Sequence, residues 1–246
     1  MDIGELARDL SPHVERLKAA RASVTDPPPW YLYETLANVA HLDALLEGPY
    51  RDLDTLSGGM PVADIGAADG DLAFTLEDQA GWSFDIVDTA RSNMNGLDGA
   101  RRLKEALASD AAIYDIDLDA QFHLPRESYG LVMFLGILYH LRNPFYALQE
   151  LAQHTRYCVM STRIARYAGP ERTDIAHLPV GYLVGPYELN NDPSNYWVFT
   201  PAGIERLVNR AGFALLNAIY VGDVEGSTPD SSEHDERVFM LLQGTR

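Results

Sequence analysis

Apolar and polar positions alternate in blocks that predict strands and helices in turn along most of the chain. Apolar runs of strand length are expected at residues 61–66, 82–88, 111–117, 130–135 and 157–162, and helical periodicity lies between them at residues 72–80, 95–107 and 144–153. Because such alternation is typical of parallel strands joined by crossover helices, it predicts an α/β fold with a Rossmann-like, doubly wound sheet.

Before this alternation the pattern is helical. Apolar residues recur at three-to-four spacing through residues 6–17, and three consecutive prolines, Pro27 to Pro29, interrupt the pattern just before Trp30. We therefore expect residues 1–57 to form an N-terminal helical segment, called here the cap segment, that precedes a second unit spanning residues 58–246.

The C-terminal part predicts two more strands, which makes seven in all. Thr200 is expected to cap a helix that ends near Ala211, and strands follow at residues 214–221 and 238–242. The segment between these strands is too polar for a buried crossover helix, so an antiparallel pair is expected at the sheet edge. Its acidic stretch at residues 230–236 is interpreted as a solvated loop rather than a metal site. Residues 163–199, called the lid segment, are expected to be an irregular insertion.

The turn after the first strand, VADIGAADGD at residues 62–71, is the most informative stretch of the chain. Gly66 and Gly70 allow positive φ and a close approach of the backbone to a ligand, and Asp64 at the strand end can accept hydrogen bonds from a polar or cationic group. A helix is expected to begin near Asp71. This arrangement predicts a nucleotide-type site over the end of the first strand.

Glycine spacing alone does not distinguish a dinucleotide site from a methyltransferase site. The carboxylate of Asp69 in the turn is expected to repel a pyrophosphate and to tolerate a sulfonium cofactor. The turn resembles motif I of the class I S-adenosylmethionine (SAM) methyltransferases, D/E-x-G-x-G-x-G, with Ala68 in place of the central glycine. The resemblance implies SAM as cofactor, with Asp64, Gly66, Ala67 and Gly70 as binding residues. A nicotinamide oxidoreductase and a turn without a ligand remain as alternatives.

Two further strand ends carry carboxylates. Asp88 lies about twenty residues beyond the glycine turn, where a carboxylate can bind both ribose hydroxyls of an adenosine, although the nearby Asp85 competes for this assignment. Strand three ends at Asp115 and Asp117, where the methyltransferase family uses an acidic residue and the adjacent backbone to bind adenine. We favour Asp117, with Leu118 beside it, over Asp115.

The segment FLGILYHLRNP at residues 134–144 is similar to the G-x-L-Y-H-x-R-x-P segment of the tRNA wobble-uridine carboxymethyltransferases. The resemblance covers about residues 25–155. It implies that Leu135 and Tyr139 contact the cofactor and that Trp30 closes over the cofactor from the cap segment. Those enzymes hold the extra carboxylate of carboxy-SAM with lysines beside the tryptophan, and this chain has no lysine between Trp30 and Gly66. Ordinary SAM is therefore expected.

The same segment supplies the candidate catalytic residues. His140, beside Tyr139, has an ordinary pKa that suits a general base at neutral pH, while a structural role for His140 is an open alternative. Arg142 is expected to bind an anionic substrate or to pair with a carboxylate of the cap segment. In the lid segment, tyrosine and asparagine side chains suit a polar small molecule, and the candidate substrate residues are Tyr182, Asn191, Asn195 and Tyr196.

Charge decides between the remaining classes of partner. The chain of 246 residues carries 19 basic and 36 acidic residues, a net charge of -17, which argues against a nucleic-acid substrate and favours a small molecule. The single cysteine, Cys158, lies in an apolar run, which is typical of a core position in a reducing cytoplasm. No signal core and no run as long as a membrane span is present, so a cytoplasmic protein is expected.

The leading hypothesis is therefore a SAM-dependent methyltransferase that acts on a small polar molecule by direct in-line transfer. Two alternatives stay open: a tRNA wobble-uridine modifying transferase that uses SAM or carboxy-SAM, and a SAM-binding protein without catalysis.

Overall fold

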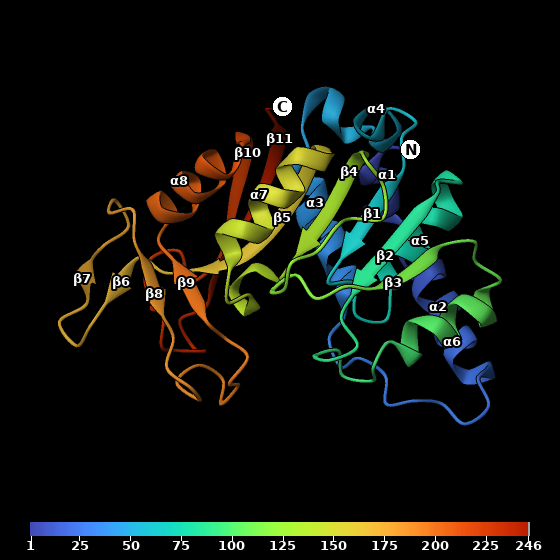
Figure 1. Cartoon of the computed structure of the whole chain (residues 1–246), viewed down its shortest axis with the longest axis horizontal. Coiled ribbons are helices and arrows are strands. Elements are labelled where there is room, and N and C mark those ends of the chain that lie inside the picture. Colours follow the sequence, from blue (N-terminus) through green and yellow to red (C-terminus); the bar gives the residue numbers. More distant parts are fainter. Residues whose placement is uncertain (246) are drawn as a thin grey trace.

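A central twisted sheet organises the fold of the chain. The computed structural model describes residues 1–245. Seven strands form its main path, in the order β10-β11-β5-β4-β1-β2-β3 (Figure 1). Their bounds are β1 Val62–Ile65, β2 Phe84–Asp88, β3 Ala112–Asp115, β4 Tyr129–Leu135, β5 Thr155–Ile164, β10 Phe213–Gly222 and β11 Glu236–Gly244. The seven predicted strands are all present, and the α/β prediction is confirmed.

Strand directions fix where a site can form. Strands β1 to β5 run parallel to one another, and β11 is antiparallel to both of its neighbours, β5 and β10. In Figure 1 the arrows of β1, β2 and β4 point to the lower edge of the molecule. The carboxyl ends of these strands therefore meet at one edge, where open α/β sheets bind ligands.

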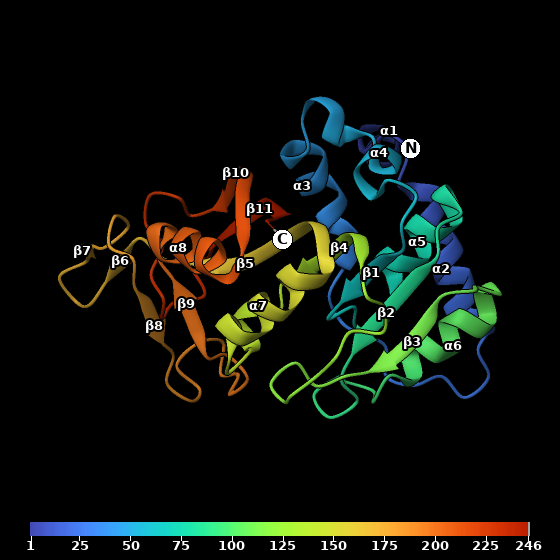
Figure 2. The ribbon, with the colours of Figure 1, turned by 45° about the horizontal axis from the view of Figure 1, so that its top comes forward.

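Helices cover both faces of the sheet. One face packs against α7 (Pro144–His154) and α8 (Pro201–Ala211), and Figures 1 and 2 show α7 beside β5 and α8 beside β10. The other face packs against α5 (Asp71–Ala80), α6 (Asp98–Leu107) and the helices of the cap segment. Those are α1 Ile3–Arg8, α2 Ser11–Ser23, α3 Asn38–Leu45 and α4 Leu53–Ser57, with short 3-10 turns at Thr35–Ala37 and Gly48–Arg51. No helix of the described residues is long and apolar enough to cross a membrane.

The two cores follow from the alternation of side chains along each strand. In β4, Leu131 and Met133 face the cap-side core, whereas Val132 and Phe134 face the core beneath α7 and α8. All four are fully buried, as expected for a strand covered on both faces. Because helices of the cap segment share the first core with the sheet, they form part of its covering layer rather than an appendage.

The lid segment is more ordered than its sequence pattern indicates. It forms four short strands, namely β6 Tyr167–Ala168, β7 Thr173–Asp174, β8 Gly181–Leu183 and β9 Trp197–Phe199. β9 pairs with the end of β5 and β8 pairs with β9, so the sheet has nine strands. The expectation of an irregular insertion is wrong here, because strands of two or three residues are too short to show an alternating pattern.

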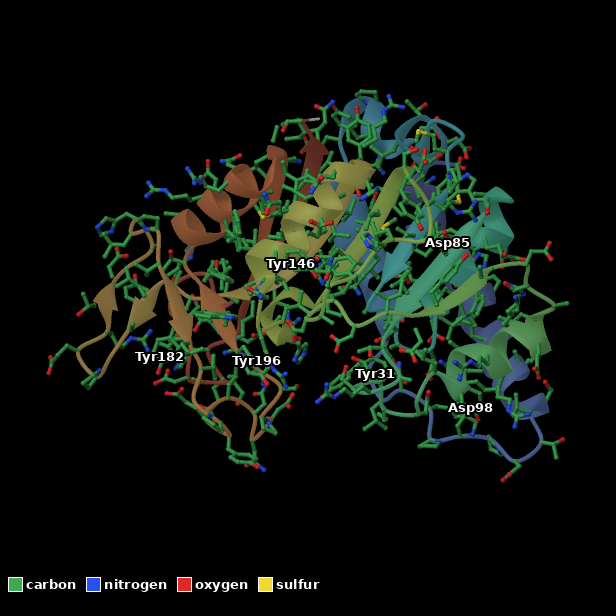
Figure 3. The ribbon with its side chains drawn as sticks, in the orientation of Figure 1. Tyr31, Asp85, Asp98, Tyr146, Tyr182 and Tyr196 are labelled. Carbon is green, nitrogen blue, oxygen red and sulfur yellow. The ribbon has the colours of Figure 1, made fainter. Side chains whose placement is uncertain are left out.

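Asp85 on β2 has a structural role. Its carboxylate is fully buried and accepts hydrogen bonds from Nε of Arg126 at 2.7 Å and from the Tyr129 hydroxyl at 2.7 Å. The labelled side chain in Figure 3 lies within the sheet region. Asp85 therefore anchors the loop before β4 and does not compete with Asp88 for a ligand.

We expect Asp85→Ala to lower the free energy of unfolding by about 3 kcal/mol, because the buried Tyr129 hydroxyl and the Arg126 guanidinium lose their acceptor. Urea denaturation at pH 7 measures the change. Asp98→Ala, which removes a carboxylate from a surface pair with Arg102, is the matched control and should cost less than about 1 kcal/mol. Equal effects of the two substitutions would contradict this assignment.

Candidate functional site

A cavity of about 530 Å³ lies at the carboxyl ends of the parallel strands. Its floor is formed by the turn after β1, by the end of β2, and by the segments that follow β3 and β4. The cap segment contributes Tyr31 and Tyr33, and the lid segment contributes Asp192, Ser194 and Tyr196. Figure 3 shows Tyr31 and Tyr196 at the same lower edge of the molecule, one from each segment. The volume of the cavity is in the range of small-molecule sites.

The turn after β1 depends on glycine at one position. Gly66 has φ of 74°, its N–H donates to the Val87 carbonyl at 2.7 Å, and a Cβ there would overlap the side chain of Ile137. Gly66 lines the cavity, as does Ala68, which was not among the predicted residues. Two predicted residues of this turn do not line it. Ala67 packs into the core, and Gly70 is the N-cap of α5, where a Cβ would meet the side chains of Ile86 and Phe74.

Asp69, the carboxylate of the turn, faces the cap segment rather than the cavity. It is only 2 % exposed and accepts hydrogen bonds from the Tyr31 N–H at 2.7 Å and from Nδ2 of Asn95 at 2.7 Å. Arg21 lies nearby and pairs with Asp71 at 2.6 Å. These contacts fasten the segment around Trp30 to the turn. Direct repulsion of a pyrophosphate by this carboxylate, on which the cofactor argument from sequence relied, therefore has no geometric basis.

Asp88 is the carboxylate that reaches the cavity from the end of β2. Its Oδ2 accepts hydrogen bonds from the Ala68 N–H at 2.9 Å and from Nδ2 of Asn93 at 3.1 Å, and its Oδ1 accepts one from the Thr89 N–H at 2.7 Å. Burial raises the pKa of Asp88, while these donors act in the opposite direction. The three donors hold the carboxylate in place over the turn, and the second lone pair of Oδ1, which has one donor, is left for a ligand.

The segment after β3 separates the two competing aspartates. Asp117 and Leu118 line the cavity, together with Ile116 and Asp119. Asp115 is not among the lining residues, and its Oδ1 accepts a hydrogen bond from the Ala90 N–H at 2.9 Å. The geometry therefore places Asp117, which the sequence argument favoured, at the cavity and Asp115 in a contact between strand ends.

Asp64 lies beneath the cavity rather than in its lining. The side chain is 5 % exposed, and burial, with a further contribution from the charge of Asp88, raises its pKa to about 7. A carboxyl group with this pKa is partly protonated at neutral pH, and because Asp64 does not line the cavity, the expected hydrogen bond from Asp64 to a ligand is not supported by its position.

The cap segment presents tyrosines, not its tryptophan, to the cavity. Trp30 packs against the cap-side core with the guanidinium of Arg21 5.4 Å from its ring, and it does not line the cavity. Tyr31 and Tyr33 line it instead, and burial raises the pKa of Tyr31 to about 12. Sequence reasoning missed both tyrosines, although their position directly after Trp30 was a usable signal.

The last residue of β4, Leu135, lines the cavity, and so do His140 and Arg142 from the segment that follows. Tyr139 does not line the cavity. Its ring lies 4.1 Å from that of His140 and 5.6 Å from the guanidinium of Arg237, so it packs behind the lining residues. Residues 138–140 form a short 3-10 turn, which directs consecutive side chains to different sides.

The lid segment matches the prediction only in part. Tyr196 lines the cavity and its hydroxyl accepts a hydrogen bond from Nε of Arg142 at 3.0 Å. Three predicted substrate residues lie elsewhere: Tyr182 donates to Glu188, Asn195 is buried and donates to the Leu189 and Asp192 carbonyls, and Asn191 is exposed. Arg142 bonds to the lid segment, so its expected pairing with a cap carboxylate is not observed.

His140 is held by the lid segment. Its Nδ1 lies 3.1 Å from the Ser194 carbonyl oxygen and 3.0 Å from the Ser194 hydroxyl oxygen. Burial lowers the pKa of His140, so the neutral imidazole is favoured at pH 7. Among residues 1–245 there is no cluster of three or more His, Cys, Asp or Glu side chains placed to hold a metal ion.

Solved structures share this architecture at low sequence identity. The N-terminal domain of EvdMO1 with S-adenosylhomocysteine (SAH) bound is 14 % identical, has a TM-score of 0.55, and the match covers 96 % of this chain and 97 % of that one. A SAM-dependent methyltransferase from Clostridium acetobutylicum is 10 % identical, with a TM-score of 0.50 and coverage of 74 % and 83 %. The chain has the class I methyltransferase fold.

The same class I fold also occurs in a protein described by a different activity. The [4+2]-cyclase SpnF matches with 9 % identity, a TM-score of 0.57 and coverage of 95 % of this chain and 92 % of that one. No family model matches the sequence, and no curated protein matches it either. Activity must therefore be argued from the site itself.

The raised pKa of Asp64 has a measurable consequence for stability. Its pKa of about 7 in the folded protein lies above the ordinary value of 3.8, so the folded state loses stability as pH rises from about 4 to 7 and the loss is constant above that range. Asp64→Asn removes this effect. We expect the difference in free energy of unfolding between Asp64→Asn and the parent to shift in favour of the variant by about 3 kcal/mol from pH 5 to pH 8. Urea denaturation at both pH values measures this shift. Parallel curves for the two proteins would contradict the buried, protonated carboxyl group.

Proposed function

We propose that this chain is a SAM-dependent methyltransferase that acts on a small polar molecule. The observation that carries the proposal is the Asp88 carboxylate, fixed by three donors at the end of β2 and exposed to the cavity. A carboxylate at this strand end is suited to bind both hydroxyls of a ribose. The EvdMO1 domain, which shares the fold, was solved with SAH bound, and this supports an adenosine-containing cofactor here.

The remaining lining residues fit the rest of such a cofactor. Asp117 and the backbone at Leu118 stand beside Asp88, where an adenine amino group needs an acceptor and its ring needs apolar contact. Gly66 brings the backbone close to the ligand, and Leu135 with Gly136 closes the opposite side. SAM, when bound, supplies a methyl group made electrophilic by the sulfonium.

The part of the cavity beyond Leu135 would receive the methyl acceptor. His140, Arg142 and Tyr196 line it with polar groups, and Tyr31 and Tyr33 add aromatic surface. Direct in-line transfer requires that the acceptor be oriented and, for a protonated acceptor, that a base be in reach. A lining histidine that is neutral at pH 7 meets the second requirement, which favours an enzyme over a binding protein without catalysis.

The charges around the cavity favour a small acceptor over a nucleic acid. Four carboxylates line it, and only two arginines do: Asp88, Asp117, Asp119 and Asp192 against Arg91 and Arg142. A polyanionic strand gains affinity from a surplus of basic side chains, whereas here the acidic side chains are in excess. A polar molecule that donates hydrogen bonds fits this lining better.

Asp88→Asn tests the cofactor site. We expect the affinity for SAH in titration calorimetry to fall by about tenfold or more, because a charge-assisted contact to the ribose is lost. Asp115→Asn is the matched control, since it changes the neighbouring strand-end carboxylate that does not line the cavity, and it should change the affinity less than about threefold. Unchanged SAH affinity in Asp88→Asn, in a protein that remains folded, would contradict the proposal.

A second candidate differs in its cofactor. Arg237 from β11 lies over the ring of Tyr139, and a Cβ at Gly136, which lines the cavity, would be 3.9 Å from its Nη1. Arg163 and Arg237 share one carboxylate, that of Asp235, so a positive charge is left over. The Arg237 guanidinium could bind the extra carboxylate of carboxy-SAM, a role that lysines near Trp30 do not fill in this chain. It therefore favours carboxy-SAM as the alternative cofactor.

Calorimetry distinguishes the two cofactors. The leading proposal expects SAM to bind more tightly than carboxy-SAM, with Arg237→Met changing the SAM affinity less than about threefold, because SAM has no carboxylate on its methyl group for this cation to bind. A preference of about tenfold or more for carboxy-SAM that Arg237→Met abolishes would instead establish the second candidate.

A further inference from the structure

The lid segment is fastened to the turn that carries His140. The Tyr196 N–H donates to the Tyr139 carbonyl at 2.8 Å, and Nε1 of Trp197 donates to the Arg142 carbonyl at 3.4 Å. Together with the hydrogen bond from Arg142 to the Tyr196 hydroxyl at 3.0 Å, these contacts join residues 139–142 to residues 196–197. Asp192 and Ser194 lie just before residues 196–197, so these contacts place their side chains beside His140.

The hydrogen bonds of Ser194 determine which imidazole nitrogen carries the proton. Its hydroxyl donates its only hydrogen to Oδ1 of Asp192 at 2.7 Å, so its oxygen can only accept from His140. The second partner of Nδ1, the Ser194 carbonyl, is also an acceptor. Nδ1 must therefore be the protonated nitrogen, and the lone pair of the neutral ring belongs to Nε2. No residue in 1–245 bonds to Nε2, and His140 lines the cavity.

Asp192 is itself held in place. The same Oδ1 accepts a hydrogen bond from the Ser194 N–H at 2.9 Å, which forms a tight turn around the carboxylate. Asp192 and Ser194 both line the cavity. A carboxylate, a hydroxyl and an imidazole thus form a continuous chain of hydrogen bonds that ends at a free nitrogen.

We propose that Asp192 and Ser194 act through His140 as a proton relay that makes Nε2 the general base for a hydroxyl acceptor. This inference rests on the proposed methyltransferase function. In the reaction, the acceptor oxygen forms a bond to the methyl carbon while the bond between that carbon and sulfur breaks, and its electron pair stays on sulfur. The proton of the acceptor hydroxyl moves to Nε2, and the Asp192 carboxylate stabilises the imidazolium through Ser194 before the proton passes to water.

The relay favours a hydroxyl over other acceptors. A carboxylate carries no proton at neutral pH. An alkylamine is an ammonium ion at pH 7, but it can lose that proton to solvent before it attacks, so neither acceptor needs a base with a fixed tautomer while the bond forms. A hydroxyl remains protonated at pH 7 and reacts faster when its proton is removed as the bond forms. Asp192 and Ser194 are accordingly positioning residues, and His140 is the catalytic one.

The charges facing His140 set the direction of the expected effects. Asp192 on the lid segment and the hydrogen bond to Ser194 raise its pKa, whereas burial and Arg237 on β11 lower it, and burial is the largest influence. The Tyr139 ring packs against the imidazole. Removing the Asp192 charge should therefore lower the pKa of His140 further.

Nuclear magnetic resonance tests the relay without knowledge of the acceptor. Long-range ¹H–¹⁵N correlation spectra of the full chain saturated with SAH report the tautomer and pKa of each of the seven histidines, and His140→Gln assigns the signal of interest. We expect His140 as the Nδ1–H tautomer, with its pKa falling by about half a unit in Asp192→Asn and in the same direction in Ser194→Ala.

Glu171→Gln is the matched control, because it removes one exposed carboxylate from the lid segment and should leave the His140 signal unmoved. An Nε2–H tautomer, or an unchanged pKa in both relay variants, would overturn the relay. Calorimetric binding of SAH is measured on the same samples, so loss of the proposed function would be seen separately. With phenols, methyl glycosides and primary amines as acceptor probes, methylation of a hydroxyl supports the acceptor class, and methylation confined to amines overturns it.

Discussion

The close approach of two loops at the carboxyl edge of the sheet is the constraint on which the site depends. The turn after β1 passes directly against Ile137 after β4, which only a residue without a side chain at position 66 permits. The ends of β1 and β4, which pair directly in the sheet, form one side of the cavity, and the end of β2 with the segment after β3 forms the other side. Parallel strands supply such an edge, and the glycine at position 66 allows the turn after β1 to approach Ile137 closely.

A chain with so many acidic residues must place each carboxylate in a defined environment. Asp85 is neutralised by Arg126, Asp69 is satisfied by donors around the cap segment, and Asp64 is buried with its pKa raised to about 7. Asp88 differs from these because its donors hold it at the cavity rather than occupy it fully. Aspartates of strands β1 and β2 and of the turn between β1 and α5 thus carry out separate tasks, and their partners decide which of them is left for a ligand.

The lid segment adds what the shared fold does not provide. A fold found both in a protein called a methyltransferase and in one called a [4+2]-cyclase leaves chemistry to the side chains above the sheet. Here those side chains come from residues 192–197, which bond to the turn after β4 and orient His140. The sheet edge thus builds the half of the cavity that we propose for the cofactor, and the half that we propose for the acceptor lies where the lid segment meets this edge.

The sequence by itself determined the order of strands and helices, the glycine at 66 and the carboxylate at 88, because these depend on local periodicity and on spacing within one crossover unit. Tertiary structure decided which neighbours face the cavity: Ala68 rather than Ala67, and Tyr31 rather than Trp30. It also brought Asp192 and Ser194 to His140, and Arg237 to Tyr139. Such pairings join residues fifty or more positions apart, and the direction of a side chain in a turn depends on backbone angles that a pattern of residue types does not specify.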